Sequence, residues 1–245
     1  MLRFSMLPVV AIATLSAIAA SADTLETAVP ALHASSTAAV VNLQFVVNGQ
    51  KTNTGYEVPA TGSAPPAYNK KTVRATYAKT TQILGGLTFK RSAATIQSDA
   101  AGHVTAPSTA IASASATVGS FTGTLSSPLG TLATVTTGKI SSQATFTQTK
   151  TGVTTQGSAR IAGLIIDAPA LGVHVTYNGT PKVNQVAFHN GDNSIVIFLN
   201  RQVTTKVDGK PVAFAVDAVD VQLRNYKIAG STISGTITVV PTTVR

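Results

Sequence analysis

Short runs in which apolar or small side chains alternate with hydroxyl or amide side chains recur along this chain. Examples are TVRATYA (72–78), IASASATVGSF (111–121) and KISSQATFTQ (139–148). A period of two residues is what a strand needs when one of its faces is covered and the other is wet. No window after the first residues has a sustained helical period with capping residues. The chain therefore has to be built from strands.

The composition favours the same structural class. Hydrophobic residues make up 44% of the 245 residues, which is enough for a sizeable core, whereas charged residues make up only 11%. Thr, Val, Ala and Gly suit strands better than helices. We predict an all-β fold of roughly ten to thirteen strands, arranged as an antiparallel two-sheet sandwich-like domain. A β-prism or β-solenoid is the alternative, because periodicity within strands does not fix how sheets are arranged.

The first residues are typical of a secretory signal peptide. Arg3 precedes an uncharged apolar stretch (5–20), and Ala-Ser-Ala (20–22) precedes Asp23. The alternative is a transmembrane anchor, but the stretch is short for a span of roughly 20 residues. We predict a signal peptide over 1–22, cleavage after Ala22, and a mature chain without a transmembrane segment. The protein would then be exported to the periplasm, the cell surface or the extracellular space.

We divide the mature chain into two parts. Residues 23–39 are small, polar and aperiodic, and we predict a flexible N-terminal arm there. Residues 40–245 are predicted to form a single β-rich domain, in which the Pro-rich stretch 55–69 is a loop. Gly85-Gly86, Asn178-Gly179 and Asp208-Gly209 are hairpin-turn signals.

Two acidic residues three positions apart, Asp217 and Asp220, raise the question of acid–base catalysis. They would share one face of a helix, but the β-branched residues around them favour a strand. In a strand, an odd separation places them on opposite faces unless a bulge intervenes. We therefore expect Asp220 to share the polar face with Arg224 in a weak ion pair, and Asp217 to share the face of Val219. We predict that neither is catalytic and that Asp217 matters more for stability.

Other chemistry finds little support in the sequence. There is no cysteine and no G-x-S-x-G segment, and the four histidines are isolated from one another. His174 and Asp167 could form a pair, but we favour a solvent-facing histidine. The segment HNGDN (189–193) offers oxygen ligands for calcium, but it lacks the spacing of a calcium loop and is typical of a turn. We predict that the protein is not an enzyme, with no catalytic residue, metal site or cofactor.

Surface contact is the remaining class of function. Tyr56 and Tyr68 flank the Pro-rich stretch and are our candidates for contact with a ligand or partner, with a structural role as the alternative. Loss of Arg3 with the signal peptide lowers the formal net charge from +9 to +8. A basic exported protein is attracted to anionic polymers of the envelope or matrix. No nucleic-acid-binding motif accompanies the charge, so we predict no specific nucleic-acid binding. Low-charge strand edges also allow self-association.

The order of segments in the second half resembles the choice-of-anchor P family of bacterial extracellular or surface proteins. The resemblance rests on SARIAGLIIDAPALGVHVTYNGTPKV, then SIVIFLNRQVTT, then VDAVDVQL, and covers roughly residues 92–240. It implies a bacterial extracellular domain without established catalytic residues. Members of the family typically end in a sorting or anchoring tail, whereas this sequence ends in VVPTTVR. We predict a noncatalytic cell-surface or extracellular-matrix β-domain that acts by structural or adhesive contact. The alternative is a secreted polysaccharide-binding or polysaccharide-active protein.

Overall fold

In the part of the chain that the structure describes, the fold consists of two antiparallel sheets of eight strands each. The computed structural model describes residues 32–83, 86–105, 108–228 and 231–245, and residues 32–245 form one compact unit. The predicted signal peptide and most of the predicted arm lie outside the described residues. The prediction of an all-β, antiparallel two-sheet fold is confirmed.

Sheet A has the strand order β13-β14-β15-β16-β1-β4, and β2 pairs with both β16 and β3. Its strands are β1 (Ala34–Ala38), β2 (Val41–Val47), β3 (Gln50–Glu57), β4 (Ala60–Ala64), β13 (Gln185–His189), β14 (Ile195–Val207), β15 (Lys210–Ile228) and β16 (Ser231–Val244).

Sheet B has the order β10-β7-β6-β8-β9-β11-β12, with β5 paired to β6 and a further pairing between β10 and β11. Its strands are β5 (Tyr68–Ile83), β6 (Leu87–Thr105), β7 (Thr109–Val118), β8 (Ser120–Ser127), β9 (Gly130–Thr137), β10 (Ile140–Thr149), β11 (Gly152–Ala168) and β12 (Val173–Gly179). A short 3-10 helix, η1 (Pro169–Leu171), joins β11 to β12.

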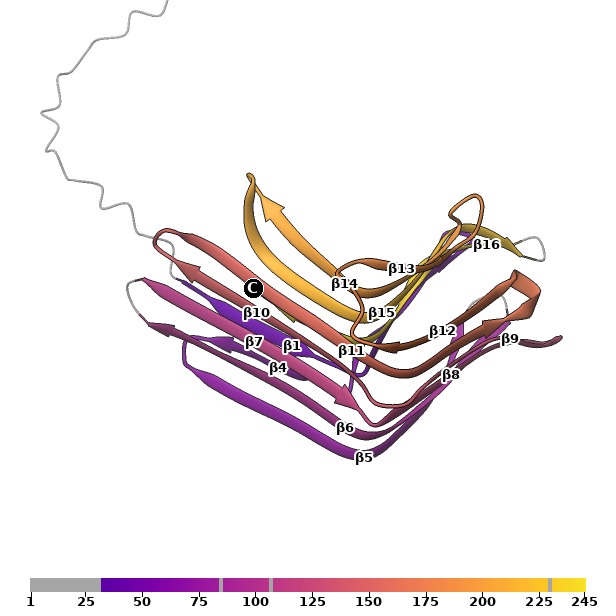
Figure 1. Ribbon diagram of the computed structural model, residues 1–245, viewed down its shortest axis with the longest axis horizontal. Coiled ribbons are helices and arrows are strands. Elements are labelled where there is room, and N and C mark those ends of the chain that lie inside the picture. The colour runs from indigo at the N-terminus through magenta and orange to yellow at the C-terminus, as the bar shows by residue number, and fades with distance from the viewer. Residues whose placement is uncertain (1–31, 84–85, 106–107, 229–230) are drawn as a thin grey trace, which may run out of the picture. The chain divides into compact units, whose positions relative to one another are not determined.

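Both sheets are folded along one line, which we call the crease. Inward-facing side chains recur at every second residue along each strand, but at the crease two successive inward-facing residues are three positions apart. These pairs are Ala38/Val41, Glu57/Ala60, Ala93/Ile96, Val118/Phe121, Thr137/Ile140, Ile161/Leu164, Val216/Val219 and Val239/Thr242. Long strands bend there, and sheet A lies on the inner side of the angle made by sheet B (Figure 1).

The backbone at the crease behaves like a row of aligned β-bulges. Gly119 N donates to Ala94 O at 2.9 Å in sheet B, and Val240 N donates to Val40 O at 2.7 Å in sheet A. Several crease residues have left-handed backbone angles, with φ between 49° and 61°: Val58, Thr95, Gly163, Asn200 and Val240. One irregular residue in a strand shifts its alternation by one position, so the same face stays covered on both sides of the bend.

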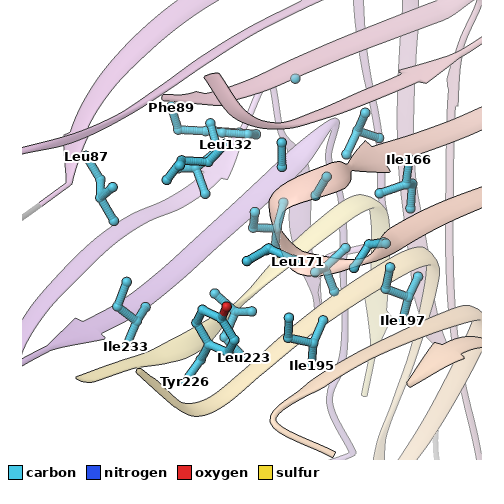
Figure 2. A pocket seen from close by; sticks show the side chains of 18 residues that line it. Leu87, Phe89, Leu132, Ile166, Leu171, Ile195, Ile197, Leu223, Tyr226 and Ile233 are labelled. Atoms are coloured by element: carbon cyan, nitrogen blue, oxygen red, sulfur yellow. The ribbon is translucent and has the colours of Figure 1, made fainter. Parts of the chain in front are cut away.

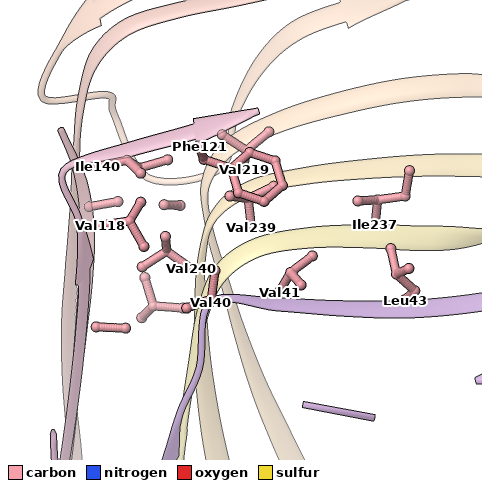
Figure 3. Close-up of a cluster of buried hydrophobic side chains, with 14 of the residues drawn as sticks. Val40, Val41, Leu43, Val118, Phe121, Ile140, Val219, Ile237, Val239 and Val240 are labelled. Atoms are coloured by element: carbon pink, nitrogen blue, oxygen red, sulfur yellow. The ribbon is translucent and has the colours of Figure 1, made fainter. Parts of the chain in front are cut away.

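The core fills the space between the sheets and is continuous across the crease. Phe121, Ile140 and Val118 of sheet B meet Val219 and Val239 of sheet A there (Figure 3). Burial of a Val, Ile or Phe side chain contributes roughly 1.5–3 kcal/mol.

The two arms on either side of the crease are packed differently. In the arm that contains β7, the inward residues of β7 itself are alanines: Ala110, Ala112, Ala114 and Ala116. The sheets approach closely in this arm, because a Cβ atom on Gly157 of β11 would lie 2.4 Å from a methyl group of Val216. In the other arm, β8 and the first part of β6 present Phe89, Phe121 and Leu125, which are larger. The second arm therefore leaves room for a cavity.

Some local predictions are wrong. Residues 34–38, predicted to belong to the flexible arm, form β1, because the small residues ASSTA fit between β16 and β4. Residues 60–64, within the predicted loop, form β4. Asn178-Gly179 does not form a hairpin turn but ends β12, where Gly179 pairs with Ile161. The turn at Asp208-Gly209 is confirmed, with φ angles of 49° and 76° between β14 and β15.

Candidate functional site

A hydroxyl-rich hollow lies on the face of sheet A that points away from sheet B. Ser36 of β1 points toward sheet B, because its Oγ donates to Ala101 O of β6. The alternation of the strand therefore turns Ser35 and Thr37 to the opposite face. We call this hollow the hydroxyl trough, and its lining side chains are Ser35, Thr37, Tyr56, Thr61, Ser63, Ala213, Thr243 and Arg245.

The strand register sets the trough's hydroxyl groups in two rows. Thr37 of β1 pairs with Thr243 of β16 on one side and with Thr61 of β4 on the other. Ser35 pairs with Ser63 in the next row. Neighbouring strands are about 4.8 Å apart, so the hydroxyl groups repeat at that interval across the trough. The rows are partly linked internally, with Thr37 Oγ1 3.0 Å from Thr61 Oγ1.

The size and chemistry of the trough suit a polar ligand. Its volume is about 620 Å³, within the range of roughly 300–1,000 Å³ that small-molecule sites occupy. Each Ser or Thr hydroxyl can donate one hydrogen bond and accept others. A ligand that carries many hydroxyl groups can exchange its bonds to water for bonds to these rows.

Arg245 is the charged residue that lines the trough. Its Nε donates to Ser35 Oγ at 2.8 Å, and a guanidinium has five N–H donors in total. The remaining donors can bind a carboxylate, sulfate or phosphate. The lining contains no carboxylate and no histidine among the described residues, so the trough offers contacts for binding but no general acid or base.

Of the two tyrosines predicted to contact a ligand, Tyr56 lies in the trough. Its side chain comes from β3, is 40% exposed and lies with its hydroxyl 3.2 Å from Thr243 Oγ1. The aromatic ring thus forms one wall of the trough, where it can stack against an apolar face of a ligand.

Tyr68 has a packing role instead. Its ring lies between the two sheets, because a Cβ on Gly62 of β4 would lie 2.2 Å from the ring and a Cβ on Gly102 of β6 would lie 2.6 Å from it. Its hydroxyl is 2.8 Å from Ser36 Oγ. Of the two tyrosines, only Tyr56 remains a candidate for contact with a ligand or partner.

The structure brings Asp217 and Asp220 together on one face of sheet A. At the crease, Val216 and Val219 face the same side of the strand although they are three positions apart. Asp217 and Asp220, each one residue further along, share the opposite side for the same reason. Asp220 is fully buried and pairs with Arg201 of β14 rather than with Arg224. Our placement of the two carboxylates on opposite faces, of Asp217 beside Val219, and of an exposed ion pair between Asp220 and Arg224 is therefore wrong. A bulge between the two residues would place them on the same face, and the crease supplies that bulge.

The electrostatics of this pair are those of a buried cluster. Burial, followed by repulsion from the Asp220 carboxylate, raises the pKa of Asp217 to about 7, although the Arg201 guanidinium opposes the shift. Arg224 donates to Gln222 Oε1 at 2.7 Å, and Gln222 Nε2 donates to Asp220 at 2.8 Å.

A second buried charge cluster was not singled out by the sequence. Glu57 of β3 accepts hydrogen bonds from Arg91 Nε at 2.6 Å, from Tyr77 Oη at 2.5 Å and from Lys79 Nζ at 2.8 Å. It thereby ties sheet A to β5 and β6 of sheet B. Burial alone would raise the pKa of Glu57, but the hydrogen bonds from Arg91, Lys79 and Tyr77 outweigh burial and lower it. The signal in the sequence is weak, because these residues are far apart along the chain.

The remaining polar candidates have ordinary surroundings. His174 and Asp167 are neighbours on β12 and β11, with Nδ1 3.5 Å from Oδ1, and both side chains are exposed. In the 189–193 segment, Asn190 Oδ1 and Asp192 Oδ1 accept hydrogen bonds from the backbone N–H groups of Ile195 and Ser194. These bonds close a turn. No cluster of three or more metal-ligating side chains occurs among the described residues.

Comparisons with known proteins do not identify a family or a function for this chain. No family model matches the chain, and no curated protein is similar to it. Among solved structures, the chain aligns with Ail, the attachment invasion locus protein of Yersinia pestis, at 6% identity and a TM-score of 0.19. That alignment covers 87% of this chain and 98% of the other. A TM-score this low carries no argument about fold or function.

The described part of the chain contains no helix long and apolar enough to cross a membrane.

Proposed function

We propose that the protein is an exported, noncatalytic β-domain that acts by adhesive contact with polymers of the cell surface or extracellular matrix, and that the hydroxyl trough is its contact site. The observation that supports this proposal best is the pair of hydroxyl rows on β16, β1 and β4, walled by Tyr56. Such a surface matches a hydroxyl-rich chain, and Arg245 adds a preference for an anionic one. The resemblance to choice-of-anchor P proteins and the signal-peptide pattern also favour a surface location.

A polysaccharide is the polymer that this chemistry fits most directly. Sugar rings present hydroxyl groups at their edges and apolar C–H groups on their faces, so the rows would bind the edges and Tyr56 the face. The polysaccharide-binding alternative thus becomes one form of adhesive contact. A polysaccharide-active role is less well supported, because the described lining of the trough carries no acid–base pair.

Polymerisation through strand edges is the second structural possibility. β5 is a long edge strand of 16 residues that pairs with β6 on one side. It carries four basic residues, Lys70, Lys71, Arg74 and Lys79. Basic side chains on an edge oppose pairing with a second copy of the same edge. We therefore favour a monomeric contact module over a filament subunit.

Binding of the purified mature chain to immobilised polysaccharides tests this proposal. We would compare an anionic polymer, alginate, with a neutral one, dextran, by biolayer interferometry. Tyr56→Ala and Thr61→Val should each weaken binding about tenfold or less, which corresponds to roughly 1 kcal/mol per lost contact. Arg245→Gln should remove the preference for alginate.

The matched control is Thr145→Val, which removes a half-buried hydroxyl on β10, in the other sheet. It should leave binding unchanged. Equal affinity of the wild type and the three trough variants for both polymers, or no binding of the wild type to either, would remove the trough as the contact site.

A further inference from the structure

A second polar hollow lies on sheet A, in the other arm from the hydroxyl trough. Its volume is about 450 Å³, and it shares no lining residue with the trough. We call it the amide hollow, and its polar lining side chains are Gln44, Lys51, Asn53, Ser234 and Thr236. They come from β2, β3 and β16, which also border the trough or contribute to it.

The amide hollow faces away from sheet B, as the trough does. On β16, Ile233 points into an apolar pocket between the two sheets (Figure 2), and Ile237 lines the same pocket. The alternation of the strand turns Ser234 and Thr236 to the opposite face. Gln44 of β2 is exposed and pairs with Thr236, so it lies on this outer face as well.

The two hollows are neighbours across the crease. Asn42 of β2 pairs with Tyr56 of β3 on one side and with Thr238 of β16 on the other, and this row lies between them. Tyr56 of the trough is three residues from Asn53 of the amide hollow, so their Cα atoms are at most about 11 Å apart. Sheet A lies on the inner side of the angle made by sheet B (Figure 1), so the hollows occupy the two walls of a concave face.

The charges of this face favour an anionic ligand at both ends. Arg245 lines the trough and Lys51 lines the amide hollow, and neither hollow has a carboxylate in its described lining. Lys51 is exposed and has no ion pair in the described part of the chain. The carboxylates of Asp217 and Asp220 lie at the crease instead, where Arg201 pairs with Asp220.

The polar groups of the amide hollow are free to bind a sugar. The side chains of Gln44 and Thr236 have no hydrogen bond to another described residue. Asn53 uses only its Oδ1, which accepts a hydrogen bond from the Gly55 N–H at 2.8 Å. Amide and hydroxyl groups can donate and accept, as sugar hydroxyls do. The half-buried Val46 adds apolar surface beside them.

We propose that the hydroxyl trough and the amide hollow form one extended site, which binds a single acidic polysaccharide chain lengthwise across the crease. This inference rests on the polymer contact proposed above, and it adds that the ligand is a long acidic stretch rather than a short or terminal sugar. Thr236 and Thr243 are seven residues apart on β16, a path of at most about 24 Å. Only an oligomer of several sugars reaches both hollows.

The test is a length series of alginate oligomers, from the disaccharide to the decasaccharide, titrated into the mature protein by calorimetry. Each hollow has the volume of a small-molecule site, so a short oligomer fills one hollow and binds weakly. Once an oligomer reaches both hollows, its second contact becomes intramolecular. The affinity should then rise at least about tenfold over a narrow range of length.

Variants in the amide hollow locate this step. Gln44→Ala/Lys51→Gln, a double change at exposed positions, should bring the affinity for the decasaccharide down toward that for the short oligomers. Lys51→Gln alone should weaken decasaccharide binding about two- to fivefold, as expected for an exposed ionic contact. Lys150→Gln removes an exposed cation from the turn between β10 and β11 and is the charge-matched control, which should bind like the wild type.

The outcomes separate this inference from the proposed function. A gradual rise of affinity with length, or a step that survives in the double variant, would refute the extended site. The trough alone would then stand if Tyr56→Ala still weakens binding of the short oligomers. No binding of any oligomer would remove the trough as well. Tighter binding of single-stranded oligodeoxythymidylate than of the decasaccharide would refute an acidic polysaccharide as the ligand.

Discussion

Arg201 on β14 and Asp220 on β15 form an ion pair in which the carboxylate is fully buried and the guanidinium is 31% exposed. In the strand register Arg201 lies opposite Asp217, so its side chain reaches diagonally to Asp220. The guanidinium also lies over the Phe198 ring, 5.3 Å from its centroid. This ion pair therefore links β14 to β15 at the crease of sheet A.

Removal of the guanidinium should be costly. Loss of one partner from a buried ion pair costs about 3–5 kcal/mol, and the partial exposure of Arg201 reduces that. We expect Arg201→Leu to lower the free energy of unfolding by about 2–4 kcal/mol in urea denaturation. The double variant Arg201→Leu/Asp220→Asn should recover part of the loss. A cost below about 1 kcal/mol would mean that the pair behaves like a surface salt bridge.

Asp217 should make stability depend on pH. Its pKa is raised from 3.8 to about 7, so the folded state holds a proton that the unfolded state releases between those values. Its contribution to stability is therefore fully present at low pH and is lost as pH rises toward 7. At 1.36 kcal/mol per unit, the loss is about 2–3 kcal/mol between pH 5 and pH 7.

Asp217→Asn should remove this slope. The asparagine cannot ionise, so its free energy of unfolding should change much less between pH 5 and pH 7 than that of the wild type. At pH 7 and above, the variant should be as stable as the wild type or more so. Asp220→Asn should cost more than Asp217→Asn at pH 8, the reverse of the order predicted from the sequence, because Asp220 is the buried partner of Arg201. Parallel pH profiles for the wild type and Asp217→Asn would show that another group carries the slope.

The Tyr77 hydroxyl should contribute measurably to the tie between the sheets. It donates to the buried Glu57 carboxylate at 2.5 Å, and hydrogen bonds to charged groups are worth about 1.5–3 kcal/mol. Tyr77→Phe should lower the free energy of unfolding by that amount. Tyr177→Phe, at a tyrosine of β12 whose hydroxyl has no hydrogen-bond partner among the described residues, should be nearly neutral. Equal effects of the two substitutions would contradict the role given to Tyr77.

Thr95 occupies a strained position at the crease. It is exposed and has a φ of 53°, a left-handed conformation that costs a β-branched residue about 1–2 kcal/mol. Asparagine tolerates this conformation better, so Thr95→Asn should stabilise the protein by about 1 kcal/mol. Thr117→Asn, at a regular position of β7, is the control and should not stabilise. The measurement is the shift in the denaturation midpoint.

The alternation of residues predicted the strands and the two sheets but not the crease. In RIAGLIID the apolar residues Ile161 and Leu164 both face the core at a spacing of three, and a strict two-residue period reads this as a strand covered on both faces. The same three-residue spacing at the crease places Asp217 and Asp220 on one face of sheet A. The sequence does carry a signal for the crease, namely a spacing of three between two apolar or two acidic residues inside an alternating run. That spacing could be assigned to a bulge only once the neighbouring strands were aligned.

Long-range contacts set the other limits. Nothing near Glu57 in the sequence indicates Arg91, because the pair forms only when β3 packs on β6. The hydroxyl rows arise because β1 inserts between β16 and β4, which joins the two ends of the described chain. Tyr56 could be proposed from its place beside a Pro-rich stretch, but Tyr68 shares that context and only packing separates them.

The most direct test of the account is protease shaving of intact host cells, combined with fractionation and N-terminal sequencing. We predict that mature protein beginning at or within a residue or two of Asp23 is cleaved from the surface of intact cells. Protein carrying Tyr56→Ala should be released into the medium more readily than the wild type. Protein found only in the soluble periplasm and protected from the protease, or retained with Met1 in place, would contradict an exported domain that works by surface contact.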